Sequence, residues 1–185
     1  MCTAVLDAIG NVKTSVDIVV YEMNAPGIND ALVDAVKRGV DVRVILNGQW
    51  WSGRPQPDPT YYKLQFAYDL SNEVAPAASG AGAGTFSAHW ASNNFNITHQ
   101  KTVVIDAVDA DGKQFASAAD LPDTASTVIL TGNLDAYKYD PSDPSTCPQP
   151  CNFYGARDFY LTVTDPNLVL EVEKVFSSDF TYTPR

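Results

Sequence analysis

A histidine and a lysine two residues apart are the side chains of this sequence best suited to chemistry. His99 and Lys101 open the segment His99-Gln-Lys-Thr-Val-Val-Ile-Asp106, whose apolar centre predicts a short strand. Side chains two apart on a strand point to the same face, so we expect the imidazole and the ammonium to lie together. A neutral imidazole can attack phosphorus, and an ammonium neutralises charge on phosphate oxygens. Asp106 is five residues beyond Lys101, so on a regular strand its side chain points to the other face. We therefore expect Asp106 to support the site rather than share its reaction face.

The residues before this segment predict a strand–helix–strand unit. Mostly apolar runs at residues 15–21 and 40–46 indicate two buried strands, and residues 28–38 between them place apolar side chains at helical spacing. Gly39 then provides a stop signal for the helix. A unit of about 30 residues in this order predicts a right-handed crossover and a parallel pair of strands. A short amphipathic helix is also expected at residues 2–12.

The second half of the chain adds strands and a last helix. We expect strands at residues 101–106, 126–130 and 158–164. The last helix is expected to begin at Asp165-Pro166, because Asp is a favoured N-cap and Pro suits the first helical position. The predicted fold class is therefore α/β, a sandwich-like single domain over residues 1–185 with a mixed central β-sheet flanked by helices.

Two stretches lack this periodicity. About residues 48–98 are interpreted as an irregular insertion, with a helix expected at residues 61–70 and a flexible Gly/Ala run at residues 79–84. About residues 138–155 are interpreted as a Cys/Pro-rich loop. In the last helix four apolar residues are expected to form one face: Leu168, Val172, Val175 and Phe176.

Composition limits the classes of function. The chain has 185 residues, 45% of them hydrophobic, so it can bury a core and is neither disordered nor fibrous. No run of about 18 apolar residues predicts a transmembrane helix, and the start lacks the basic region of a signal peptide. A net charge of −10 argues against non-specific nucleic-acid binding, which needs Lys and Arg. Few lysines with many Thr, Ser, Asn and Ala residues favour an exported or membrane-peripheral protein, although the compartment is not fixed by the sequence.

The three cysteines do not suggest a metal site. Cys147 and Cys151 form a C-x3-C pair that could close a small disulfide or remain as two thiols, and Cys2 has no obvious partner. A zinc site needs about four ligands. The only histidines, His89 and His99, are distant from the pair in sequence, so we expect no metal and no other cofactor.

The histidine–lysine segment carries a family resemblance. H-x-K-x4-D is the signature of the phospholipase D superfamily, and His99, Lys101 and Asp106 match it in full. The upstream strand–helix–strand unit also resembles the opening of that family's domain, including the domains of cardiolipin synthases. The resemblance spans most of the chain and implies a phospholipase D-like α/β sandwich. It covers one half-site only, because His89 is not followed by the required lysine.

The resemblance extends to further site residues. The family's G-[ST]-x-N element is matched by Thr131 and Asn133, with Leu130 in place of the usual glycine. It implies that the Asn133 carboxamide donates to a phosphate oxygen. It also implies that Asp158 orients the histidine of the opposite half, as a carboxylate on an imidazole fixes its tautomer.

The family mechanism joins two half-sites and needs no metal. One histidine attacks phosphorus and becomes phosphohistidine, while the other protonates the leaving alcohol. With one motif, we expect either a homodimer or a longer protein with a second, C-terminal repeat, and the second option is slightly favoured. The resemblance implies a phosphodiesterase or phosphatidyltransferase, and the acidic net charge favours a phospholipid substrate. A metal-independent nuclease of the same superfamily and a non-catalytic half-domain remain as alternatives.

Overall fold

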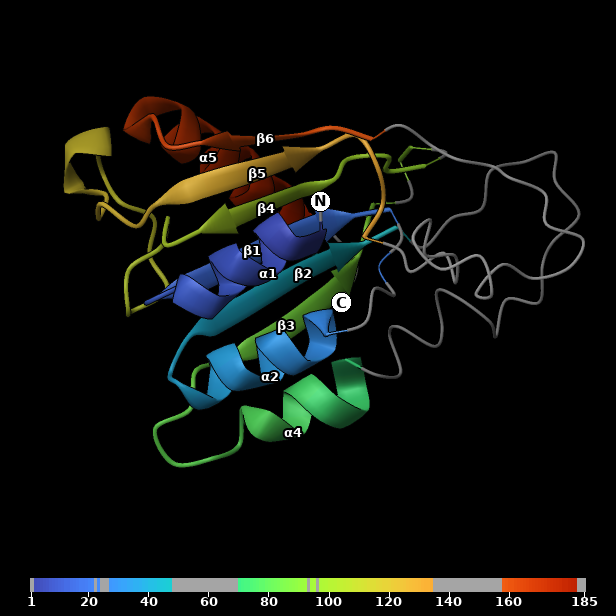
Figure 1. Cartoon of the computed structure of the whole chain (residues 1–185), viewed down its shortest axis with the longest axis vertical. Coiled ribbons are helices and arrows are strands. Elements are labelled where there is room, and N and C mark those ends of the chain that lie inside the picture. The colour runs from blue at the N-terminus through green and yellow to red at the C-terminus, as the bar shows by residue number, and fades with distance from the viewer. Residues whose placement is uncertain are drawn as a thin grey trace, which may run out of the picture.

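The computed structural model describes residues 2–21, 23, 27–47, 70–92, 94–95, 97–134 and 158–182 (Figure 1). Their helices and strands follow in chain order: α1 (Cys2–Asn11), β1 (Ser15–Val20), α2 (Ile28–Lys37), β2 (Asp41–Leu46), the π-helical turn η1 (Leu70–Val74), α4 (Ala75–Ala77), β3 (Phe86–Trp90), β4 (Thr102–Ile105), the 3-10 turn η2 (Ala118–Asp120), β5 (Ser126–Leu130), β6 (Tyr160–Val163) and α5 (Pro166–Tyr182). The α/β class is confirmed.

The strands form one mixed six-stranded sheet in the order β3-β2-β1-β4-β5-β6. β1 pairs with β2, and β2 with β3, in parallel, which confirms the predicted parallel pair. The remaining pairs, β1–β4, β4–β5 and β5–β6, are antiparallel. It follows that β1, β2, β3 and β5 end, and β4 and β6 begin, at the same edge of the sheet, called the site edge below.

Helices cover both faces of the sheet (Figure 1). The face under α1 and α2 holds the main core, because alternate residues of each strand point to it; Val16, Ile18 and Val20 of β1 are examples, each no more than 1% exposed. The opposite face is covered by α5, in two smaller clusters centred on Phe176 and Val169. Burial of these apolar surfaces is the main favourable term in folding.

The predicted face of α5 is confirmed for Phe176, which is 1% exposed, and for Val172, which packs against the cluster around Val169, but it is wrong for the other two residues. Leu168 and Val175 are 56% and 53% exposed, whereas Glu173 is fully buried together with Val169 and Leu170. Apolar spacing alone assigned the face, but the sheet beneath α5 presents Arg43, which holds the Glu173 carboxylate. Asp165 caps the helix as predicted, accepting hydrogen bonds from the backbone N–H groups of Asn167 and Leu168 at 3.0 and 3.1 Å.

The interpretation of residues 48–98 as an irregular insertion needs correction. Its described part contains η1, α4 and the sheet strand β3, whose Phe86 and Trp90 pack on the main core while His89 points to the α5 face. Five residues without a β-branched side chain gave too weak a strand signal. Gly84 leads into β3 so close to β2 that a Cβ there would lie 2.0 Å from the Val40 carbonyl oxygen. The helix expected at 61–70 lies, except for Leu70, outside the described residues, as do Cys147 and Cys151.

Candidate functional site

His99 and Lys101 lie at the site edge, directly before β4. The His99 side chain is exposed, and its ring meets the Tyr21 ring edge-on with centroids 5.0 Å apart. Lys101 is only 4% exposed; its Nζ donates to the His99 carbonyl oxygen at 3.0 Å and lies 5.5 Å from the centroid of the same Tyr21 ring. One tyrosine at the end of β1 therefore contacts both the imidazole and the ammonium.

The two side chains reach the same Tyr21 ring, as the sequence predicted, but strand alternation is not the cause. Strand alternation was expected to aim both to one face, but β4 begins only at Thr102, after Lys101. The lysine instead folds back so that its ammonium reaches the backbone of His99. This leaves a charged group buried beside an exposed imidazole, an arrangement able to attract an anion because a buried cation has few water contacts of its own.

Asn47 is a polar residue of the site that the sequence analysis missed. It follows β2 at the site edge, is 2% exposed, and its Oδ1 accepts a hydrogen bond from the Thr98 backbone N–H at 2.9 Å. This contact fixes the backbone next to His99. A signal was present in the sequence, because Asn47 directly follows a buried apolar run, but nothing local connects it with a histidine some fifty residues on.

Thr131, Asn133 and Asp158 lie at the same edge. The Leu130 N–H donates to the Lys101 carbonyl oxygen at 2.9 Å, which carries the end of β5 alongside the start of β4. Asn133, half-buried, follows two residues after Thr131. The Thr131 Oγ1 accepts from the Phe159 N–H at 2.8 Å and lies 3.4 Å from Asp158 Oδ1. The strand pairing thus brings five of the six predicted site residues to one edge.

The lack of a side chain at Gly132 leaves space for Asp158. A Cβ at residue 132 would lie 2.4 Å from the carboxyl carbon of Asp158, so Gly132→Ala must displace that carboxylate. If Asp158 orients an imidazole, Gly132→Ala should lower kcat by roughly tenfold, with KM changed less. Steady-state kinetics on a chromogenic phosphodiester measures this. Gly10→Ala is the matched control, because nothing lies within 4 Å of a Cβ at Gly10; equal kinetics for both variants would contradict the role of Asp158.

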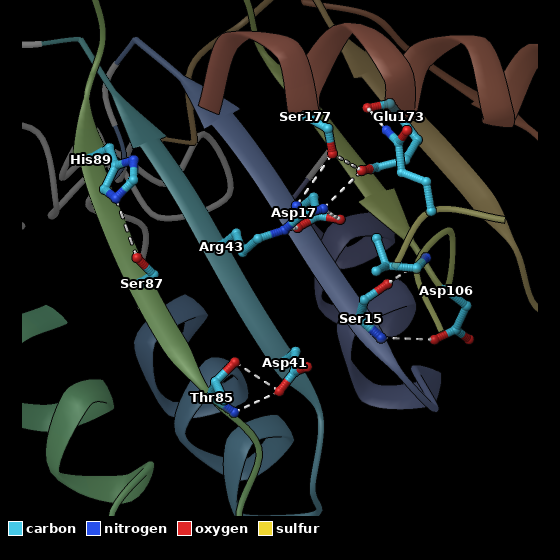
Figure 2. Close-up of polar contacts among 12 residues, drawn as sticks. Ser15, Asp17, Asp41, Arg43, Thr85, Ser87, His89, Asp106, Glu173 and Ser177 are labelled. Carbon is cyan, nitrogen blue, oxygen red and sulfur yellow. Dashed lines mark hydrogen bonds and ion pairs between the residues drawn. The ribbon is translucent and has the colours of Figure 1, made fainter. Parts of the chain in front are cut away.

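Asp106, the sixth predicted site residue, lies at the opposite end of β4. The strand and its flanks separate it from His99 by roughly 20 Å. Asp106 is fully buried, and its Oδ1 accepts the backbone N–H groups of Lys13, Thr14 and Ser15 at 2.9, 2.7 and 3.3 Å (Ser15 and Asp106 are labelled in Figure 2). It therefore joins the end of β4 to the connection between α1 and β1, far from the site edge.

Asp106→Ala should destabilise the protein by about 2–3 kcal/mol, because three backbone donors lose their acceptor. The same change should leave kcat of the folded protein nearly unaltered. Urea unfolding and kinetics on one preparation separate the two effects. Asp106→Asn is the matched control: an amide oxygen can replace Oδ1, and Asn tolerates the φ of 53° at this position. A loss of kcat without a loss of stability in Asp106→Ala would show a direct role in the reaction.

A charged cluster holds α5 on the sheet (Figure 2). Arg43 on β2 donates to both carboxylate oxygens of Asp17 on β1, at 2.6 and 2.8 Å, and to Glu173 Oε1 on α5 at 2.8 Å. Burial raises the pKa of Asp17, hydrogen bonding to Arg43 opposes this, and the nearby Glu173 charge raises it further. Burial lowers the pKa of Arg43, but the two carboxylates outweigh it and leave that pKa raised.

His89, the second histidine, packs against α5. Its ring stacks on Phe180 with centroids 4.0 Å apart, and its Nδ1 lies 3.1 Å from the Phe180 carbonyl oxygen. Within the described ranges, no three His, Cys, Asp or Glu side chains gather as a metal site. No helix in that part of the chain is long and apolar enough to span a membrane.

Comparisons with known proteins agree with this fold. The family described as cardiolipin synthase, PLD-like domain, matches residues 5–133, which include His99, Lys101, Asp106, Thr131 and Asn133. The chain therefore belongs to the phospholipase D-like family. The match ends before Asp158 and α5. No curated protein sequence matches the chain.

Solved structures show the same fold at low sequence identity. Nuc from Salmonella typhimurium, a phospholipase D family member, is 20% identical with a TM-score of 0.60, over 98% of this chain and 88% of that chain. NucT from Helicobacter pylori is 14% identical with a TM-score of 0.56, over 98% and 87%. TrmBL2, an archaeal chromatin protein with a novel mode of DNA binding, is 8% identical with a TM-score of 0.54, over 98% and 48%.

Proposed function

We propose that this chain is one half of a phosphodiesterase or phosphatidyltransferase that cleaves phospholipids through a phosphohistidine. The observation that carries the proposal is the exposed His99 ring beside the buried Lys101 ammonium, both in contact with Tyr21. An exposed imidazole is accessible to a substrate. Burial places the lysine ammonium in a medium of low dielectric constant, which strengthens the attraction between that ammonium and a phosphate. Membership of the phospholipase D-like family supports the same chemistry.

The proposed reaction needs a second half-site, from another copy of the chain or from a second repeat. The imidazole of one half forms an N–P bond, and the P–O bond to the alcohol breaks. The imidazolium of the other half gives its proton to the departing oxygen. That same imidazole then takes a proton from water or from an acceptor alcohol, which attacks phosphorus and releases the histidine. Lys101 and Asn133 would bind the non-bridging oxygens, and Asp158 would orient an imidazole.

A nuclease is the second candidate. The likeness to TrmBL2, a chromatin protein that binds DNA, supports DNA as a ligand at the level of the fold, and the phosphodiester chemistry of the family would then cleave it. Charge favours the lipid: the chain carries −10, and the one lysine of the motif is buried. A nucleic-acid groove needs several exposed cations along the phosphate backbone.

One assay separates the three functions. Vesicles of phosphatidylcholine and phosphatidylglycerol and single-stranded DNA are each incubated with the protein and a chelator, and released head groups and nucleotides are measured. Head-group release supports the proposal, and cleavage of DNA alone replaces it with the nuclease. No cleavage by a preparation shown by sizing to be a dimer would support the non-catalytic half. Because the chelator removes free divalent ions, any activity that remains does not depend on them.

A further inference from the structure

A hollow lies beside His99, between the segment leading into β4 and the last turns of α5. It has a volume of about 390 Å³, large enough for the alcohol portion of a phosphodiester. Its floor is apolar and comes from the α5 face of the sheet, with Val19 and Ile45 1–2% exposed. Thr98 and His99 from the segment before β4 also line the hollow, as do Asp179 and Tyr182 of α5.

The hollow has a distinct chemical character. Among the described residues that line it, Asp179 is the one acid, and His99 is the one other titratable side chain apart from the Tyr182 phenol. Phe95 and Tyr182 also line it and are 67% and 79% exposed, so their rings are available to a ligand. A carboxylate beside aromatic rings attracts a cation, and aromatic faces suit an alkylated ammonium in particular. An anionic alcohol would instead meet a like charge.

The position of the hollow follows the geometry of phosphoryl transfer. The attacking and the leaving groups lie on opposite sides of phosphorus in an in-line displacement. When His99 is the proton donor and the imidazole of the other half attacks phosphorus, the oxygen that His99 protonates belongs to the group held next to it. In that arrangement the hollow receives the leaving alcohol.

We propose that this hollow is the leaving-alcohol subsite and that Asp179 selects cationic amino-alcohol head groups over anionic or neutral ones. The inference rests on the proposed function, and it adds that specificity resides in α5, outside residues 5–133 that match the family. Partial burial raises the pKa of Asp179. A bound cation favours the carboxylate form and would lower that pKa again, so binding and ionisation of Asp179 support each other.

Asp179→Asn tests the selection. Short-chain phosphatidylcholine and phosphatidylglycerol, dissolved as monomers, are compared through kcat/KM for choline and glycerol release. Asp179→Asn should lower kcat/KM for phosphatidylcholine by roughly three- to tenfold and leave phosphatidylglycerol unchanged, as expected for one partly screened charge pair. Asp179→Lys should reverse the preference. Glu171→Gln is the matched control, because Glu171 is an exposed α5 acid whose one described ion pair, with Lys174, is itself on the surface.

Two results would overturn the subsite. Equal losses on both lipids in Asp179→Asn would indicate a structural role, and no change on either would exclude Asp179 from selection. Binding of phosphocholine, measured by calorimetry, keeps the test independent of catalysis: the wild type should bind it more tightly than Asp179→Asn does. Phosphocholine binding without lipid cleavage would refute the proposed function but keep the subsite. If the protein cleaves lipids but Asp179→Asn binds phosphocholine as tightly as the wild type does, the proposed function is kept and the subsite is refuted.

Discussion

His99→Ala should lower phosphodiesterase turnover by at least about 10³-fold, because it removes one of the two proposed catalytic imidazoles, and both of them in a homodimer. The side chain is exposed, so its loss should change the free energy of unfolding by less than about 1 kcal/mol. Kinetics on a chromogenic phosphodiester and urea unfolding measure the two quantities. Wild-type enzyme mixed with labelled substrate and quenched in alkaline denaturant, where an N–P bond survives, should carry label that His99→Ala lacks.

His89→Ala is the internal control for this prediction, since the described chain has one other histidine, His89, and it packs on α5. Loss of its stacking on Phe180 should lower stability while the folded protein keeps its turnover. A His99→Ala variant with wild-type turnover would refute the phosphohistidine. Activity lost equally in both variants would indicate that each acts through the fold.

The sequence predicted what local patterns determine. Apolar runs and helical spacing gave β1, α2 and β2 within one or two residues, and the parallel pairing followed from their order. His99 and Lys101 stay close together in the folded chain because both belong to one short segment that leads into β4. Here local and tertiary preferences agree, which is why a short pattern was sufficient.

The sequence failed where partners distant along the chain decide the structure. β3 is a strand because β2 offers it an edge, not because its five residues favour strand on their own. Glu173 lies on the buried face of α5 because Arg43 on the sheet binds its carboxylate. The helical spacing of apolar residues cannot predict a buried acid. Asn47 reaches the His99 segment through a backbone N–H, a contact without any sequence signature. Each miss involves a polar group satisfied by a non-local partner.

The same polar partners make Arg43 the residue on which the attachment of α5 depends. Arg43→Met should destabilise the protein by about 3–5 kcal/mol near neutral pH, because it leaves Asp17 and Glu173, both fully buried, without their counter-ion. Loss of the guanidinium from the Phe176 and Phe180 rings, 5.1 and 5.5 Å away, adds to this. Since α5 also carries Asp179, the hollow beside His99 should loosen before the main core unfolds.

The pH dependence of this loss identifies its cause. The folded-state pKa of Asp17 is raised above its unfolded value, so the stability that a neutral Asp17 provides is complete below about pH 4 and lost as pH rises through the raised pKa. Arg43 lowers that pKa, and Arg43→Met must therefore raise it further and cost more at about pH 7 than at about pH 4. Urea unfolding at both pH values measures the difference.

Adding Asp17→Asn and Glu173→Gln to Arg43→Met should recover much of the stability, since no buried charge then lacks a partner. A loss that is equal at both pH values, and is not recovered in the triple variant, would assign the role of Arg43 to packing alone.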